Sequence, residues 1–263
     1  MSSRNNNFSK DFEKGLKKIL AFDDEIIVFQ TQIFKTCLLY NLSGHKVAKE
    51  ILKILEKKFE KKTILFPSFS NDLAIKKKYD EILSLPNTGI IPITALKSKK
   101  YFRTPSPLHS FLAKGPLVKE IKKLNQQTTW GNGSVFEWLE KKNARWVSLN
   151  LEWSSGCALH HRSEELCKVP YRFYKKYNGM YYINKKFIKR IVEKKYSYSL
   201  KKKPIFDFTK WPKFLKKQDT ANIFLNKGLK FRTALAKVIT KRSCEFFRKD
   251  PYGSVINKKI FLK

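Results

Sequence analysis

The chain has 263 residues, of which 42% are hydrophobic, and a formal net charge of +34. It can therefore bury a substantial core, which excludes a fully disordered protein. No window of about 20 residues is free of charge, so a membrane-spanning helix is excluded and we expect no membrane partner. The polar N-terminus lacks the apolar stretch of a secretory signal, which favours the cytoplasm.

The positive charge first suggests a nucleic-acid partner, because clustered cations release counterions from phosphate. Only nine of the 56 basic residues are arginine, however, and the lysines are spread from Lys10 to Lys263. This pattern favours a solvated surface over a nucleic-acid-binding module. The four cysteines are scattered without zinc-ligand spacing, so we predict neither a disulfide framework nor a metal site.

The first elements in chain order indicate an α/β protein. Residues 25–34 are rich in β-branched and aromatic residues and predict a strand that runs into a loop. Apolar residues at three- and four-residue spacing predict a helix over residues 46–61, with Ser43 as its cap. The apolar run "TILFPSF", residues 63–69, predicts a buried strand.

The rest of the chain continues the alternation of helix and strand. Short helices are predicted within residues 115–125 and 133–144, followed by a buried strand over residues 145–153. Residues 179–195 fit either a hairpin or a helix, and residues 228–251 fit two strands or a helix. We find no repeat or linker, so we expect a single domain over residues 1–263, with about ten disordered residues at its N-terminus.

Two loops after apolar segments hold polar residues that can bind a ligand. The loop "PSFSN" contains Ser68 and Ser70, although a capped turn explains these residues equally well. The loop "YFRTPSPLHSFLAKG" is stiffened by two prolines ahead of His109. A histidine that only ties the loop down by hydrogen bonds is the alternative there.

The stretch "CALHHRSEELCKVPYRFYK", residues 157–175, contains two of the four histidines of the chain. If a helix starts near Ala158, Glu164 lies three residues from His161 and four from His160, so spacing does not choose between them. A carboxylate beside an imidazole fixes its tautomer and raises its basicity, as a general base requires. The alternative is a surface pair worth a few tenths of a kcal/mol.

Five segments in this order resemble the aminoglycoside 3-N-acetyltransferase family. They are "TILFPSFSN", "TGIIPITAL", "YFRTPSPLHSFLAKG", "WGNGSVFEWLEKKNARWVSL" and the stretch from Cys157. The resemblance as a whole extends over about residues 23 to 180. The His-x-x-Glu pattern of the family fits His161 and Glu164 and leaves His160 at a position that is usually apolar.

The resemblance implies a layered α/β/α fold with a mixed central sheet. It also implies transfer of acetyl from acetyl-CoA to an amine of an amino sugar, either an aminoglycoside or a sugar of polysaccharide biosynthesis. His161 would then be the general base, oriented by Glu164. The residues that the resemblance assigns to cofactor binding and to the oxyanion are Ser68, Ser70, Arg103, His109, Ser110 and Ser134, the last in a Gly-x-Gly-Ser turn.

The chain departs from the family at two positions. Gln30 stands where the first strand of the family usually ends in a histidine, and Asn150 stands where a glycine is common. The first departure leaves open a catalytically impaired relative that binds a sugar or partner. A chain of +34 would also repel a polycationic aminoglycoside, so a less cationic acceptor, such as a nucleotide-linked amino sugar, fits the charge better.

Overall fold

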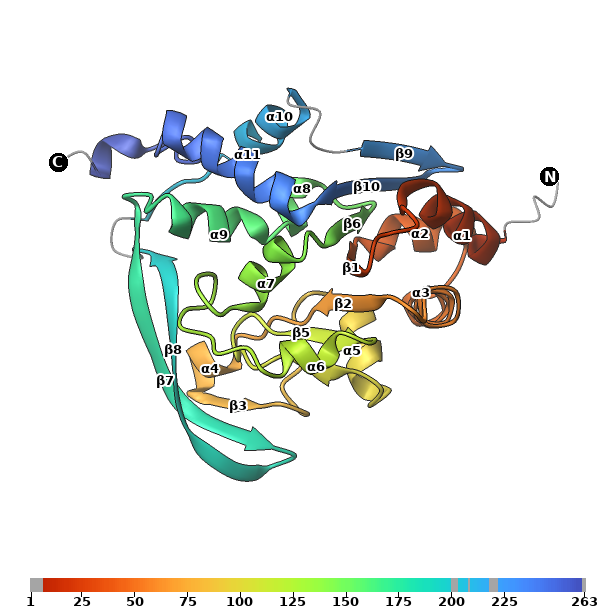
Figure 1. Cartoon of the computed structure of the whole chain (residues 1–263), viewed down its shortest axis with the longest axis horizontal. Coiled ribbons are helices and arrows are strands. Elements are labelled where there is room, and N and C mark those ends of the chain that lie inside the picture. The colour runs from red at the N-terminus through yellow and green to blue at the C-terminus, as the bar shows by residue number, and fades with distance from the viewer. Residues whose placement is uncertain (1–6, 200–202, 208, 218–221, 262–263) are drawn as a thin grey trace.

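The computed structural model describes residues 7–199, 203–207, 209–217 and 222–261 (Figure 1). The helices are α1 Phe8–Ile19, α2 Ile33–Tyr40, α3 Gly44–Lys58, α4 Asp72–Lys76, α5 Ile90–Lys97, α6 Val118–Ile121, α7 Val135–Lys141, α8 Trp153–Gly156, α9 Leu159–Leu166, α10 Lys210–Lys217, α11 Ala236–Lys249 and the 3₁₀ helix η1 Lys258–Phe261. The strands are β1 Ile26–Thr31, β2 Thr63–Pro67, β3 Lys78–Asp80, β4 Phe102–Arg103, β5 Phe111–Lys114, β6 Arg145–Leu149, β7 Arg172–Ile183, β8 Lys186–Tyr198, β9 Asn222–Asn226 and β10 Leu229–Leu235.

Seven strands form a mixed central sheet in the order β4-β5-β2-β1-β6-β10-β9. The three central strands β2, β1 and β6 are parallel, and antiparallel strands extend the sheet on both sides. The carboxyl ends of β1, β2 and β6 consequently meet at one edge of the sheet. In open sheets of this kind, ligands bind at that edge.

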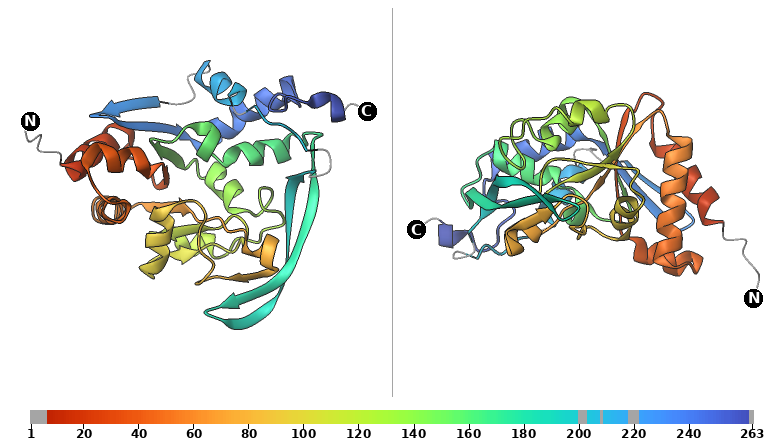
Figure 2. Two further views of the ribbon diagram at one scale, coloured as in Figure 1. Left: turned by 180° about the vertical axis from the view of Figure 1, so that it is seen from behind. Right: turned by 90° about the horizontal axis from the view of Figure 1, so that it is seen from below.

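Side chains of the central strands alternate between two hydrophobic cores, one on each face. Ile26 and Val28 of β1 pack with α7, α9 and α11, whereas Ile27 and Phe29 pack with α1, α3 and α5. The right-hand view of Figure 2 shows the orange helix α3 and the green helices on opposite sides of the sheet. This arrangement confirms the predicted layered α/β/α fold with a mixed central sheet.

Most of the predicted elements are present, with shifted ends. Helix α3 begins after Ser43, whose side chain accepts a hydrogen bond from the Lys46 amide, as predicted. The loop expected after β1 is instead helix α2, and the strand predicted to reach Trp153 ends at Leu149. Predicted disorder over the first ten residues is wrong from Phe8 onward, because the buried Phe8 ring begins α1; residues 1–6 lie outside the described part of the chain.

The two ambiguous segments are resolved. Residues 179–195 belong to a long antiparallel hairpin of β7 and β8, which forms a second sheet with β3. Residues 228–251 form one strand, β10, followed by helix α11. Within the described residues, no helix is long and apolar enough to cross a membrane.

Candidate active site

A cavity of about 420 Å³ lies at the carboxyl edge of the central sheet. Residues 29–33 at the end of β1, residues 87–92 before and in α5, and Gly156 of α8 contribute to its wall. Helices α2 and α5 both begin there. Their N-cap residues, Gln32 and Gly89, make no side-chain hydrogen bond to the first turn. First-turn N–H groups without a side-chain cap are suited to binding an anion.

A second cavity of about 190 Å³ adjoins the first and shares Phe69, Ser155 and Gly156 with it. Its wall contains three histidines, His109, His160 and His161. The structure therefore brings together histidines that lie about 50 residues apart in the sequence, as the resemblance implied.

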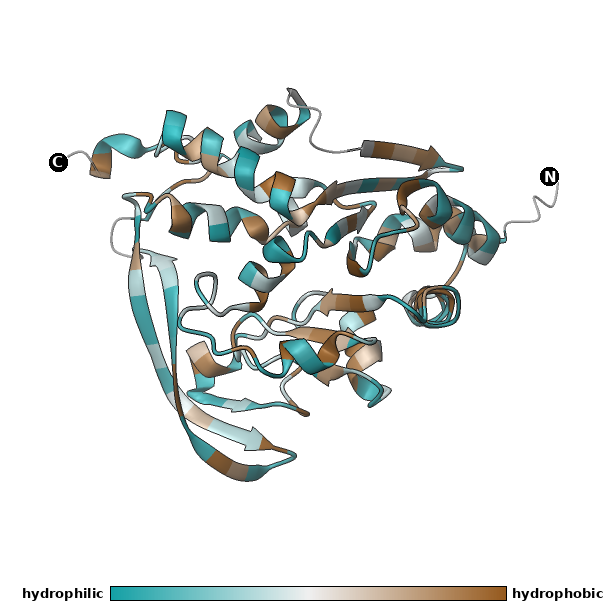
Figure 3. Ribbon diagram, viewed as in Figure 1, coloured by the Kyte–Doolittle hydropathy of each residue, from teal (hydrophilic) through white to brown (hydrophobic). Residues whose placement is uncertain are grey.

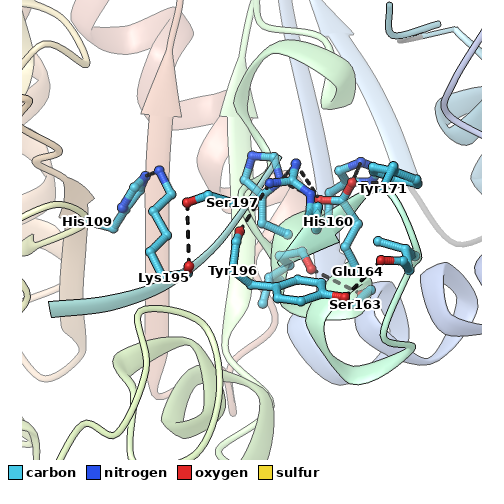
Figure 4. A network of polar contacts seen from close by, with 12 residues as sticks. His109, His160, Ser163, Glu164, Tyr171, Lys195, Tyr196 and Ser197 are labelled. Carbon is cyan, nitrogen blue, oxygen red and sulfur yellow. Dashed lines mark hydrogen bonds and ion pairs between the residues drawn. The ribbon is translucent and has the colours of Figure 1, made fainter. Parts of the chain in front are cut away.

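The pair His161 and Glu164 stands on helix α9, one turn apart. His161 Nδ1 lies 2.7 Å from Glu164 Oε2, and the Glu164 side chain is fully buried. Two residues at the start of the hairpin complete the surroundings of the carboxylate. Tyr171 donates its hydroxyl to Oε1 at 2.7 Å, and the Arg172 guanidinium lies 2.8 Å from Oε2 (Figure 4).

These contacts fix the protonation of the pair. Burial alone would raise the pKa of Glu164, but Arg172 and the two histidines hold it well below its usual range, so the carboxylate is ionised. An ionised carboxylate only accepts hydrogen bonds, and Glu164 is nearer to His161 Nδ1, at 2.7 Å, than Arg172 Nη2 is, at 3.1 Å. We therefore assign the proton to Nδ1, which leaves Nε2 unprotonated, with Arg172 donating to the carboxylate rather than to the ring. Burial, followed by the charge of Arg172, lowers the pKa of His161 below 6.5, so the imidazole is neutral at pH 7. A neutral imidazole with a free Nε2 can accept a proton.

His160 has a different environment. Its ring packs against Trp211 at 4.6 Å and Phe247 at 5.1 Å, between centroids, and its Nε2 lies 3.5 Å from Glu164 Oε1. Burial lowers its pKa to about 4. These aromatic neighbours give the ring of His160 an apolar environment, in accord with the apolar position that the resemblance implies.

His109 lies across Trp130 from His161. The Trp130 ring centroid is 4.2 Å from that of His109 and 5.0 Å from that of His161. Lys195 Nζ approaches His109 Nε2 at 3.5 Å (Figure 4). Burial, and then the charge of Lys195, keeps the pKa of His109 well below 6.5. With Nε2 as the acceptor, the proton of His109 sits on Nδ1, a buried atom with no partner among the described residues.

The loop that carries His109 is held by a buried carboxylate of the hairpin. Glu193 accepts hydrogen bonds from Ser106 Oγ at 2.6 Å, from the Leu108 amide at 2.9 Å and from Thr129 Oγ1 at 2.7 Å. Its neighbour Lys195 is half-buried, and burial lowers the pKa of its ammonium to about 8. The hairpin thus positions both loops that flank the histidines.

Five of the six residues predicted for cofactor binding lie outside both cavities. Most of their polar groups are engaged in the fold, whereas the buried Ser68 Oγ has no hydrogen-bond partner among the described residues. Arg103 is buried, with its guanidinium hydrogen-bonded to the carbonyls of Ser68 and Ser84 and to Ser110 Oγ. Ser110 Oγ donates to the Ser68 carbonyl, and Ser70 Oγ accepts from the Asp72 amide.

Ser68 and Ser134 are also fully buried, and Ser134 Oγ caps α7 by accepting from the Glu137 amide. The Gly-x-Gly turn before Ser134 packs closely against other segments of the protein and not against either cavity. A Cβ at Gly133 would lie 1.9 Å from the Asn125 carbonyl, and one at Gly131 would lie 2.5 Å from Glu165 Oε1. Only His109 of the predicted set borders a cavity. A cofactor role for the other five stays a prediction that their positions do not favour.

Both departures from the family have a structural setting. Gln30 borders the larger cavity, where its Nε2 donates to Ser148 Oγ at 2.6 Å. Asn150 adopts a left-handed conformation with φ of 54°, which glycine adopts most readily and asparagine tolerates best among the others. Asn150 therefore suits the turn, and Gln30 is a neutral side chain at the position where the resemblance predicts a histidine.

His160, His161 and Glu164 place three potential metal-ligand atoms within 4.8 Å of one another. The guanidinium of Arg172 already lies 2.8 Å from the Glu164 carboxylate and 3.1 Å from His161 Nδ1. A cationic side chain thus takes the place that a metal ion would need.

Sequence reasoning did not identify Trp130, Arg172 and Lys195 as parts of the site. "VPYR" directly after the His-x-x-Glu stretch was a signal for Arg172. Lys195 had no such signal, because it is separated from His109 by 86 residues in a lysine-rich chain.

Comparison with known proteins provides independent evidence on the family of this chain. The sequence model of the family described as aminoglycoside 3-N-acetyltransferase matches residues 49–223. No curated protein matches the chain by sequence.

Solved structures similar to this chain share its fold at low sequence identity. Aminoglycoside acetyltransferase AAC(3)-IVa in complex with a gentamicin superposes with a TM-score of 0.74 at 13% identity, covering 95% of this chain and 92% of that one. Aminoglycoside acetyltransferase AAC(3)-IIb has a TM-score of 0.74 at 12% identity and coverages of 92% and 97%. The YokD protein from Bacillus subtilis has a TM-score of 0.73 at 14% identity and coverages of 92% and 99%.

Proposed function

The chain belongs to the aminoglycoside 3-N-acetyltransferase family, a family of N-acetyltransferases, and from this membership we propose that it acetylates a primary amine of an amino sugar with acetyl-CoA. His161 acts as the general base, and Glu164 orients it. The observation that carries the proposal is the 2.7 Å contact between these residues at the wall of a cavity.

The chemistry follows from the protonation of the pair. Neutral His161 takes a proton from the acceptor ammonium through Nε2, while Glu164 stabilises the imidazolium that forms. The freed amine attacks the thioester carbonyl, so a carbon–nitrogen bond forms and the carbon–sulfur bond breaks. Coenzyme A leaves as the thiol with the proton that His161 returns, and the nitrogen of the new bond releases its second proton to water as the neutral amide forms.

Two features support the assignment of substrates to the cavities. The larger cavity has two helix N-termini on its wall, which suits the phosphates of acetyl-CoA. The smaller cavity contains His161 and accommodates the acceptor amine. His109 also borders the smaller cavity, beside His161.

Charge near the acceptor cavity favours an acceptor with few ammonium groups. Asp207 is the one acid on its described wall, and the Asp207 carboxylate already accepts hydrogen bonds from Thr209. Glu164 is paired with Arg172, and Glu193 is buried and already accepts several hydrogen bonds. An anionic amino sugar, such as a nucleotide-linked one, therefore fits a protein of +34 better than a polycation.

The test is release of free thiol from acetyl-CoA with three acceptors: a nucleotide-linked amino sugar, a neutral amino sugar with one amine, and sisomicin. We expect the highest kcat/KM for the anionic acceptor, with a decrease as NaCl is raised from 50 to 300 mM, because salt screens attraction. If sisomicin is the best acceptor at low salt, the acceptor class is wrong. If no amine supports thiol release while acetyl-CoA still binds, the transferase proposal itself fails and a catalytically impaired relative is indicated.

Removal of a nearby cation tests the assignment of the base by pH dependence. The charge of Lys195 contributes to the lowered pKa of His161. The acid limb of the kcat profile should therefore lie below pH 6.5 in the wild type and move to higher pH in Lys195→Met. Lys194→Met, on the adjacent residue of β8, is the matched control and should leave the limb in place. An unmoved limb in Lys195→Met would show that another group controls it.

A further inference from the structure

The hairpin of β7 and β8 runs from the active site to a far end beside β3. Arg172 at its start contacts Glu164, whereas its turn at Asn184 and Lys185 lies beyond the body of the molecule (Figures 1 and 2). Strand β7 has 12 residues, which corresponds to roughly 35–40 Å. The catalytic chemistry uses only the near end of the hairpin.

The turn at the far end is fixed by one carboxylate. Asp80 of β3 accepts hydrogen bonds from the backbone amides of Ile82, Leu83, Asn184 and Lys185, at 2.7 to 3.1 Å. Both turn residues have positive φ, which the type I′ geometry of a two-residue hairpin requires. Asp80 thus ties two segments about 100 residues apart into one rigid surface.

This surface exposes large apolar side chains. Figure 3 shows brown segments at the end of the hairpin. The exposed residues of the two segments, which we call the hairpin-tip patch, are Ile82 (39%), Leu83 (45%), Leu85 (58%), Ile183 (39%), Phe187 (50%) and Ile188 (43%). Exposed apolar groups that gather at one rigid end usually mark a contact with another surface.

Cations surround the patch. Lys185, Lys186, Lys189 and Arg190 lie at the turn, and residues 183–190 contain no acid. Two more lysines, Lys77 and Lys78, precede Asp80, whereas Lys76 is paired with Asp72. The nearby acids are engaged, since Asp80 caps the turn and Glu81 accepts the hydroxyl of Tyr181.

We propose that the hairpin-tip patch docks on an anionic lipid bilayer. Aliphatic and aromatic side chains of the patch enter the interface between headgroups and acyl chains, and the surrounding lysines attract the acidic headgroups. Such docking is a contact with the membrane surface and needs no membrane-spanning helix. The charges in every window of about 20 residues exclude a spanning helix, but they do not exclude a surface contact. The proposal does not depend on the acetyl transfer reaction.

Two other occupants fit less well. All but one of the patch residues, Phe187, are isoleucine or leucine, whose side chains neither stack on bases nor bind phosphate. Binding of nucleic acid would therefore leave most of the exposed apolar surface unexplained. In a second copy docked through the same patch, the lysines of one tip would face those of the other, which like-charge repulsion disfavours.

The test is co-sedimentation of the full chain with extruded vesicles at 0.1 M NaCl. One set consists of phosphatidylcholine, and the other contains 30% phosphatidylglycerol. We expect binding to the anionic vesicles and little to the neutral ones. Lys185→Glu with Lys186→Glu should weaken binding by about thirtyfold or more, since each lysine near the surface contributes about fivefold. Ile183→Ser with Phe187→Ser should weaken it by about tenfold, because apolar surface no longer leaves water.

Matched variants control for charge and hydrophobicity. Lys53→Glu with Lys57→Glu changes the net charge equally on exposed positions of α3, and Phe22→Ser removes a fully exposed phenylalanine elsewhere. Both should bind vesicles as the wild type does. Thermal unfolding and thiol release in solution should be unchanged in the tip variants, which separates a docking defect from misfolding and from failure of the acetyltransferase proposal.

Three results would overturn the proposal. The first is no binding of the wild type to anionic vesicles, and the second is equal loss in the tip and control pairs. The third is a self-association or duplex DNA binding that the tip variants abolish while vesicle binding persists.

Discussion

In the His161→Ala variant, we expect kcat for acetyl transfer to fall by about 10²- to 10⁴-fold, with little change in KM for acetyl-CoA. The lowered pKa of His161 keeps its imidazole neutral at pH 7, and Glu164 holds the tautomer with Nε2 free. Alanine removes the proton acceptor and leaves the donor cavity intact. The measurement is thiol release at saturating acetyl-CoA and acceptor.

The neighbouring histidine provides the control. His160→Ala should retain kcat within a few-fold but lower the melting temperature, because the ring fills space between Trp211 and Phe247. Added imidazole should restore part of the rate of His161→Ala, since a diffusible base can occupy the vacated space. If His160→Ala loses the rate and His161→Ala keeps it, the two roles are reversed.

The helix that carries His161 and Glu164, the pair we propose to be catalytic, is predictable from the sequence because both residues lie on one local element. A helix beginning near Ala158 is present, and it places His161 and Glu164 on one face. The choice between His160 and His161, however, needed the order of distant motifs, since both reach the same carboxylate.

The remainder of the site depends on long-range contacts that local patterns do not encode. Ser68 and Ser110 lie in loops whose polar residues could bind a ligand. The buried guanidinium of Arg103 instead donates hydrogen bonds to the Ser68 carbonyl and to Ser110 Oγ, which fixes the two loops. Lys195 reaches His109 only because β8 runs antiparallel along β7. A sequence shows which side chains can bind a ligand, but not which of them the fold has already used.

In the fold as well, elements defined by local sequence patterns are predictable, whereas elements that depend on residues far apart in the sequence are not. Apolar runs and helical spacing predicted β1, β2, β6 and α3, whose residues alternate or repeat toward a core. The sequence does not predict helix α2, because the helix has no side-chain cap and no glycine or proline separates it from β1. The hairpin turn lacks glycine and is held by Asp80, so its stabilising partner lies about 100 residues away.

Glu164→Ala should be the most destabilising single substitution in the site, with a loss of about 3–5 kcal/mol in the free energy of unfolding. The carboxylate is fully buried, and its removal leaves the Arg172 charge without an anion and the Tyr171 hydroxyl without an acceptor. For a chain of this size, we expect a melting temperature lower by about 10 °C. Glu245→Ala, which breaks a partly exposed pair with Arg242, should change stability by less than about 1 kcal/mol.

Glu164→Gln removes the charge of the side chain and keeps its shape. The difference in the free energy of unfolding between this variant and the wild type should therefore depend on pH. The pKa of Glu164 is lowered in the folded protein, whereas an unfolded glutamate titrates near about 4.3. The ionised carboxylate therefore contributes its full stability above about pH 5, and that contribution declines as the pH falls toward the folded pKa. The stability gap between the wild type and Glu164→Gln, measured by urea unfolding, should be largest at pH 7 and narrow by pH 3. A gap that stays constant would mean that the ion pair with Arg172 does not supply the stability, and the carboxylate would then act on His161 alone.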